Sequence, residues 1–179
     1  MQVEARTHRP STPEAPIRAG VPHTVDELLQ LEPETLARLY AEATVPDIAR
    51  LTGDLRGRML AWPAVRGRAG GVLRWLAGRD RFPWRGKSFS ALSGDTGEGI
   101  NRVVIDRLKL FRFTTFVGAS RAGGFDAVQL DYDHPGNPFF IRAVKDEIRE
   151  LRPGLYLGQA YLHTEARDRL VLYFGLQTP

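Results

Sequence analysis

The chain lacks cysteine, and this absence removes several kinds of chemistry. None of its 179 residues is Cys, so disulfides, thiol nucleophiles, thiolate zinc sites and cysteine-ligated iron–sulfur clusters are excluded. Only four residues are His, which argues against a histidine-rich metal centre. We therefore expect no metal site and no other cofactor.

Long apolar runs are also missing. No stretch approaches the roughly 20 apolar residues of a membrane-spanning helix. Residues 1–20 lack the apolar core of a secretory signal. Lysine is scarce as well: apart from Lys87, Lys109 and Lys145, every basic residue counted in the net charge is Arg, a bias typical of a GC-rich genome. We expect a cytoplasmic bacterial protein.

The positive charge is concentrated in the middle of the chain. The net charge is +4, composed of −4 over residues 1–49, +8 over residues 50–87 and 0 over residues 88–179. Basic residues mixed with tryptophans can bind nucleic acid, and residues 50–87 contain Trp62, Trp75 and Trp84. No recognised binding motif accompanies this charge, so we interpret it as a solvated face and expect no nucleic-acid partner.

The chain begins with a proline-rich stretch that precedes a single domain. Residues 1–22 contain four Pro and few apolar residues, which predicts a flexible tail before a domain over 23–179. Thr24, followed three residues later by a Glu, predicts a capped short helix, and Pro33 predicts the first turn of a second helix.

From residue 47 onward the pattern favours strands. Six to eight short strands at intervals of roughly 8–12 residues predict an antiparallel sandwich or barrel, flanked or plugged by the N-terminal helices. A short helix is expected over 65–80, and residues 138–151 fit either a helix or an extended crossover. Expected strands cover 47–63, 82–92, 100–106, 108–120 and 125–133, with a hairpin over 154–177.

Among candidate catalytic residues, Asp131, Tyr132 and Asp133 stand out. Strand alternation places Asp131 and Asp133 on one face and Tyr132 on the other. Two neighbouring carboxylates can raise the pKa of one of them for acid–base catalysis, or bind a hard cation. The alternative is that they flank a turn and face water.

A second candidate pair is Arg142 and Asp146, which are four residues apart. On a helix they would form a surface ion pair of little energetic consequence, or one of them would hold a polar ligand group at the mouth of a cavity. Arg112, between Phe111 and Phe113, leaves two alternatives: either the Arg or the two Phe side chains face inward. Other polar residues interleaved with aromatics are Asn101, Thr114, Gln159 and His163.

Two short motifs carry a resemblance to a known family. Gly53-Asp54-Leu55-Arg56-Gly57 has the glycine spacing of a GXWXG motif, with Leu55 at the Trp position, and Trp84-Arg85-Gly86-Lys87-Ser88-Phe89 is similar to a W-x-G-K-x-F element. The chain thus resembles the GXWXG group and its companion domain of unknown function over about residues 47–177. The resemblance implies a mainly β fold with N-terminal helices, namely an antiparallel calycin-like (lipocalin-like) β-barrel that holds apolar ligands. With Leu55 at the Trp position, either Trp75 or Trp84 fills the gap, or the cavity is larger.

The leading hypothesis is therefore a barrel that binds a small hydrophobic or amphipathic molecule, with Lys87, Arg112 or Arg142 neutralising a carboxylate or enolate. The alternative is a cofactor-independent cyclase or isomerase for a polyketide- or terpenoid-like substrate, and the third is a basic-surface interaction module. An apolar stretch at 170–176 is a candidate homodimer contact. The expected ligand-binding residues are Trp84, Lys87, Arg112, Thr114, Tyr132, Arg142 and Tyr156.

Overall fold

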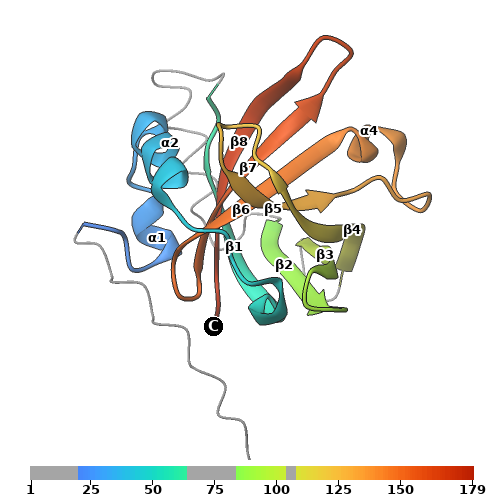
Figure 1. The fold of residues 1–179 in the computed structure, drawn as a ribbon, viewed down its shortest axis with the longest axis horizontal. Coiled ribbons are helices and arrows are strands. Elements are labelled where there is room, and N and C mark those ends of the chain that lie inside the picture. The colour runs from blue at the N-terminus through green and yellow to red at the C-terminus, as the bar shows by residue number, and fades with distance from the viewer. Residues whose placement is uncertain (1–19, 64–83, 104–107) are drawn as a thin grey trace, which may run out of the picture.

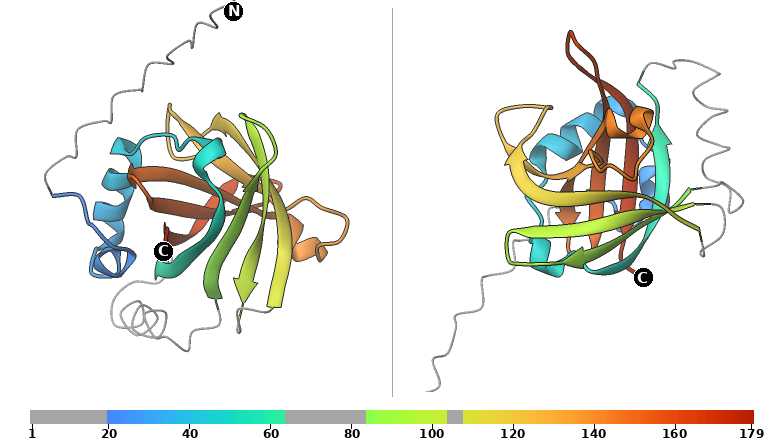
Figure 2. Two further views of the ribbon diagram at one scale, coloured as in Figure 1. Left: turned by 90° about the horizontal axis from the view of Figure 1, so that it is seen from below. Right: turned by 90° about the vertical axis from the view of Figure 1, so that its right-hand side faces the viewer.

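Eight strands form one closed antiparallel barrel in the computed structural model, which describes residues 20–63, 84–103 and 108–179. Each strand pairs with its neighbours in the chain, and β8 returns to pair with β1 (Figures 1 and 2). The expected mainly β, calycin-like (lipocalin-like) architecture is confirmed. The strands are β1 Gly53–Ala61, β2 Trp84–Ala91, β3 Thr96–Val103, β4 Leu108–Ala119, β5 Asp126–Asp131, β6 Val144–Arg152, β7 Leu155–His163 and β8 Asp168–Gln177.

The two N-terminal helices flank the barrel and do not plug it. α1 (Val25–Leu28) is capped by Thr24, whose Oγ1 accepts a hydrogen bond of 3.1 Å from a backbone N–H in the first turn. α2 (Pro33–Glu42) begins at proline, as expected. Together with outward residues of β1, β7 and β8 they form an apolar cluster, and Figure 2 shows them against the outside of the wall.

A short 3-10 helix closes one end of the barrel. This helix, η1 (Ile48–Arg50), contacts β2 and β3. Ile48 is 2% exposed and belongs to the apolar cluster inside the barrel. We call this end of the barrel the closed end.

A β-bulge in β2 directs the side chains of Trp84 and Lys87 to the same face. Strict alternation would place Trp84 and Lys87 on opposite faces, since they are three residues apart. The pairing of β2 with β3 shifts register between Trp84 and Gly86, and Gly86 has a φ of 126°. A Cβ at Gly86 would lie 2.1 Å from the carbonyl oxygen of Leu55, so only glycine fits, and both side chains face inward.

Residues 138–151 are neither one helix nor one extended segment. Phe139–Arg142 form the single turn α4, and Val144–Arg152 form the paired strand β6. Because Asp146 lies on that strand, the i,i+4 pairing with Arg142 that a helix would have produced does not occur. The helix expected over 65–80 and most of the predicted tail, residues 1–19, lie outside the described residues.

Candidate functional site

A cavity of about 340 Å³ occupies the interior of the barrel away from η1. Its walls are mainly apolar, and four polar side chains converge on it. Residues from seven strands, α4 and the position after β5 line it: Met59, Trp84, Lys87, Asn101, Val103, Phe111, Tyr132, Ile141, Val144, Asp146, Ala160, Leu172 and Phe174.

The interior is filled at the closed end and hollow beyond it. On β4, for example, Phe111 lines the cavity and Phe113 belongs to the filled core. On β8, Phe174 lines the cavity and Leu176 does not. The filled part of the interior therefore lies beside η1, and the cavity lies beyond it.

The four polar side chains Lys87, Asn101, Tyr132 and Asp146 form the floor of the cavity, and we call them the floor cluster. Nζ of Lys87 donates to Asn101 Oδ1 at 2.8 Å, to Tyr132 Oη at 2.5 Å and to Asp146 Oδ2 at 2.9 Å. Tyr132 Oη donates to the same Asp146 oxygen at 2.9 Å. Because all four side chains are at most 8% exposed, these bonds replace the hydration that burial removes.

Aromatic rings surround the buried ammonium group of Lys87. Its Nζ lies between 5.1 and 5.6 Å from four ring centroids, those of Trp84, Phe113, Tyr132 and Phe174. A cation near a ring face is attracted by the ring quadrupole. These rings and the Asp146 carboxylate together compensate the charge.

Burial sets the acid–base properties of the floor cluster. It lowers the pKa of Lys87, although the negative charge and hydrogen bond of Asp146 act in the opposite direction. Burial also raises the pKa of Tyr132 well above its ordinary value, and the neighbouring Asp146 carboxylate raises it further. Tyr132 thus stays a neutral hydroxyl.

One carboxylate oxygen of the floor cluster has no hydrogen-bond partner. Asp146 Oδ1 is buried and accepts no hydrogen bond from any described residue. An unpaired buried acceptor is costly, at roughly 1–3 kcal/mol. The atom belongs to a residue that lines the cavity, so a bound molecule is a candidate partner.

Backbone strain occurs at the same site. Phe111, a cavity residue, has a φ of 63°, and the register between β3 and β4 shifts beside it. A bulky residue in this region costs of order 1–3 kcal/mol, and such strain clusters at functional sites.

Three of the expected ligand-binding residues lie on the cavity: Trp84, Lys87 and Tyr132. Arg112 and Thr114 do not, because they face outward and are exposed, while the two Phe side chains beside Arg112 face inward. Their positions outside this cavity differ from the expected ones, and of the two alternatives left open at this strand the structure has the one in which the Phe side chains face inward.

The other two expected ligand-binding residues also lie away from the cavity. Arg142 is half-exposed and forms an ion pair with Asp133 at 2.5 Å. Tyr156 faces inward but lies in the filled core, with its pKa raised to about 12 by burial and by the nearby Glu150.

Asp131 and Asp133 do not act as a carboxylate pair. Asp131 pairs with Lys145 at 2.6 Å and Asp133 with Arg142. Burial would raise the pKa of Asp131, but hydrogen bonds from Lys145 and from the backbone N–H of Asp133 outweigh it, so the pKa is lowered. The predicted alternation is confirmed, because Tyr132 alone of the three lies on the cavity.

The sequence did not identify Asn101 and Asp146 as parts of one cluster. Asn101 carried a weak signal as a polar residue among aromatics, and Asp146 was ambiguous because its segment resembled a helix. Their common link is Lys87, which is opposite Asn101 in the β2–β3 register.

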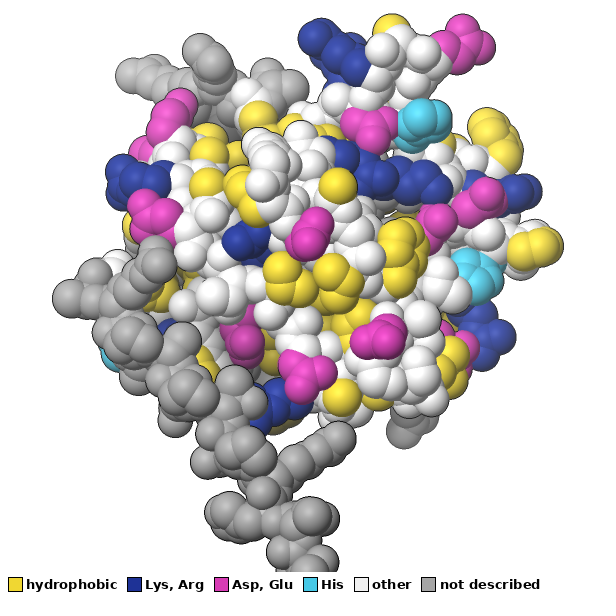
Figure 3. Space-filling view, viewed as in Figure 1, with side chains coloured by type: hydrophobic (Ala, Val, Ile, Leu, Met, Phe, Trp, Pro, Cys, Tyr) yellow, Lys and Arg dark blue, Asp and Glu magenta, His cyan; other side chains and the backbone are white. Residues whose placement is uncertain are grey.

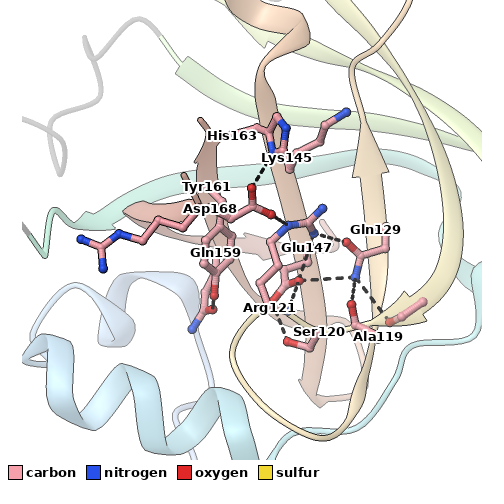
Figure 4. Close-up of polar contacts among 12 residues, drawn as sticks. Ala119, Ser120, Arg121, Gln129, Lys145, Glu147, Gln159, Tyr161, His163 and Asp168 are labelled. Carbon is pink, nitrogen blue, oxygen red and sulfur yellow. Dashed lines mark hydrogen bonds and ion pairs between the residues drawn. The ribbon is translucent and has the colours of Figure 1, made fainter. Parts of the chain in front are cut away.

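A second polar network lies on the outer face of the barrel, as Figure 4 shows. Glu147 is fully buried there and accepts hydrogen bonds from Tyr40, Ser120, Arg121 and Gln129. Its partners come from α2, β5 and the β4–β5 turn. This network holds α2 and the β4–β5 turn against the wall, and none of its residues lines the interior cavity.

Charges of both signs are interspersed over the face shown in Figure 3. Among the described residues no cluster of His, Asp and Glu has an arrangement suited to a metal ion. Within the same residues, no helix combines the length and apolar character required to cross a membrane.

No family model and no curated protein matches the chain. A solved structure of a protein from Thermomonospora curvata is similar, with 17% sequence identity, coverage of 83% of this chain and 88% of that chain, and a TM-score of 0.49. The assignment of the fold depends on the closed barrel itself.

Proposed function

We propose that the barrel binds a small, largely apolar molecule with one polar group. The observation that carries this proposal is a cavity of about 340 Å³ with apolar walls and a polar floor. Ligand pockets are typically 300–1,000 Å³ with a few placed polar groups. A cavity of about 150 Å³ is enough for benzene, so a ligand of roughly ten carbon atoms fits here.

Native mass spectrometry of the purified protein, followed by denaturing extraction, tests this proposal. A stoichiometric adduct with an apolar skeleton is expected. Leu172→Trp should abolish the adduct by filling the cavity, whereas Val171→Trp, which places the same side chain on the exposed outer face, should keep it. An adduct retained equally by both variants would contradict binding in the cavity.

The second candidate function is catalysis in the same cavity by a cofactor-independent isomerase or cyclase acting on a polyketide- or terpenoid-like substrate. It is favoured by the direct contact of an amine, a phenol and a carboxylate at Lys87, Tyr132 and Asp146. Such groups can transfer protons without a metal, and a shaped cavity can hold one folded conformer of a substrate.

Catalysis is tested by incubating the extracted molecule with fresh protein. Isomerisation leaves the mass unchanged, so chromatographic retention and NMR spectra are the readouts. Conversion by the wild type but not by Asp146→Asn, with binding retained, would support the enzyme. Unchanged ligand in both samples would favour the binding protein.

A further inference from the structure

The hydrogen-bond donors of the floor cluster are nearly all used within the cluster. A lysine ammonium group has three N–H donors and no acceptor, and Lys87 uses three, on Asn101, Tyr132 and Asp146. The hydroxyl hydrogen of Tyr132 is directed at Asp146 Oδ2. The indole N–H of Trp84 donates to Asn101 Oδ1 at 3.1 Å.

The unmet hydrogen-bonding capacity of the floor lies on Asp146 and Asn101. Asp146 Oδ1 is buried without a partner among the described residues. Asn101 Nδ2 donates one of its two hydrogens to Tyr132 Oη at 3.1 Å, which leaves one N–H. A group that both donates and accepts matches this pair of vacancies.

The charge of the floor cluster excludes an anionic partner. Lys87 and Asp146 neutralise each other at 2.9 Å, and no other Lys, Arg or His is among the described residues that line the cavity. A buried carboxylate would therefore lie beside Asp146 without a counter-ion, and an unpaired buried charge is strongly unfavourable. An ammonium group would meet the same difficulty beside Lys87.

We propose that the polar group of the ligand is a neutral alcohol, whose hydroxyl donates to Asp146 and accepts from Asn101. This inference rests on the proposed binding function and replaces the expectation that Lys87 neutralises a carboxylate or enolate. It assigns the ligand to the class of apolar alcohols of about ten carbons.

Isothermal titration calorimetry of the full chain at pH 7.5 with three matched probes tests this inference. Geraniol, geranyl methyl ether and geranic acid share one ten-carbon skeleton. The ether keeps the oxygen but cannot donate, and the acid is ionised at this pH. We expect geraniol to bind at least tenfold more tightly than either of the other two.

The outcomes separate the two proposals. If no probe binds, binding of a ligand of this size in the cavity is wrong, and the alcohol inference falls with it. If the ether or the acid binds as tightly as geraniol, the cavity binds ligands but the alcohol inference is overturned.

Asp146→Asn supplies a second, independent readout. The substitution removes the charge that compensates Lys87 and keeps the side-chain shape. The preference should then move toward geranic acid by at least tenfold relative to geraniol, since Lys87 becomes available to a carboxylate. An unchanged preference in a folded variant would contradict the inference, and the three-probe series on the wild type decides it if the variant does not fold.

Discussion

Lys87 and Lys145 each pair with an aspartate, but their surroundings differ. The Lys87–Asp146 pair is buried, with side chains 3% and 6% exposed, while Lys145–Asp131 is 21% and 35% exposed. Removing one partner of a buried pair leaves an uncompensated charge. We therefore expect Lys87→Met to lower the free energy of unfolding by about 3–5 kcal/mol in urea denaturation.

Lys145→Met is the matched control. Exposed pairs contribute about 0.2–1 kcal/mol, so its unfolding free energy should fall by no more than that. Equal losses of unfolding free energy in the two variants would show that burial does not make the Lys87–Asp146 pair more important for stability than the exposed pair.

Gly57 is required for its small size. A Cβ there would lie 2.5 Å from the Trp84 ring and 2.5 Å from the Cα of Gly86. We expect Gly57→Ala to destabilise the protein by about 1–3 kcal/mol through overpacking, measured by thermal and urea unfolding. Gly94→Ala, where a Cβ meets nothing within 4 Å, should change stability little, and the reverse order would disprove this explanation.

At this scale the sequence predicted the direction of a side chain only where alternation was regular. It placed Tyr132 opposite Asp131 and Asp133 correctly. It could not decide whether Arg112 or its two Phe neighbours face inward, because both arrangements give the same alternation.

Leu55, at the expected Trp position, is buried inside the barrel. The ring of Trp84 covers Gly57.

Among the elements, the hairpins were predictable and β6 was not. The β4–β5 and β7–β8 hairpins follow turn residues, as expected, although the β7–β8 pairing shifts register between Ala160 and Tyr161. In β6, inward Asp146 and outward Glu147 are both buried, so the strand has no apolar–polar alternation. One face is covered by the floor cluster and the other by α2. A local sequence pattern does not reveal that a strand will be covered on both faces.

Glu147 connects three elements, so its removal should loosen them selectively. Its carboxylate accepts from Tyr40 in α2 at 3.0 Å and from Ser120 in the β4–β5 turn at 2.6 Å. Hydrogen bonds to a charged group contribute about 1.5–3 kcal/mol. We expect Glu147→Gln to speed amide hydrogen exchange in α2 and residues 120–125, with β2 and β3 unchanged.

Exposed Glu98 on β3 provides the control. Glu98→Gln should leave exchange in α2 and the β4–β5 turn at the wild-type rate. Faster exchange spread evenly over the barrel in Glu147→Gln would mean that the network stabilises the whole fold and not these elements.

For the whole molecule, all five tyrosines have raised pKa values. Burial is the largest cause for each of them. A raised pKa in the folded state means that folding favours the neutral phenol. The resulting stabilisation is complete below the ordinary tyrosine pKa of 10. It is lost as pH rises from 10 toward about 12, the pKa of Tyr156 in the folded protein.

Ultraviolet titration of tyrosinate checks this expectation. At about pH 11 the native protein should show little tyrosinate, while the protein in urea should show most of its phenols ionised. The free energy of unfolding should also fall as pH rises from 10 toward about 12. Native tyrosines that ionise near pH 10 would contradict the burial of the phenols.

The level at which the interior changes from filled to hollow has a consequence for variation. Apolar residues beside η1 fill the closed end, whereas the wall residues Met59, Val103 and Leu172 line the cavity and pack against the edge of the same apolar cluster while only partly buried. Exchange of these wall residues would change the shape of the cavity while the fully buried side chains beside η1 stay the same. In the proposed binding function, such exchanges would alter which molecule fits while the filled end of the barrel is kept.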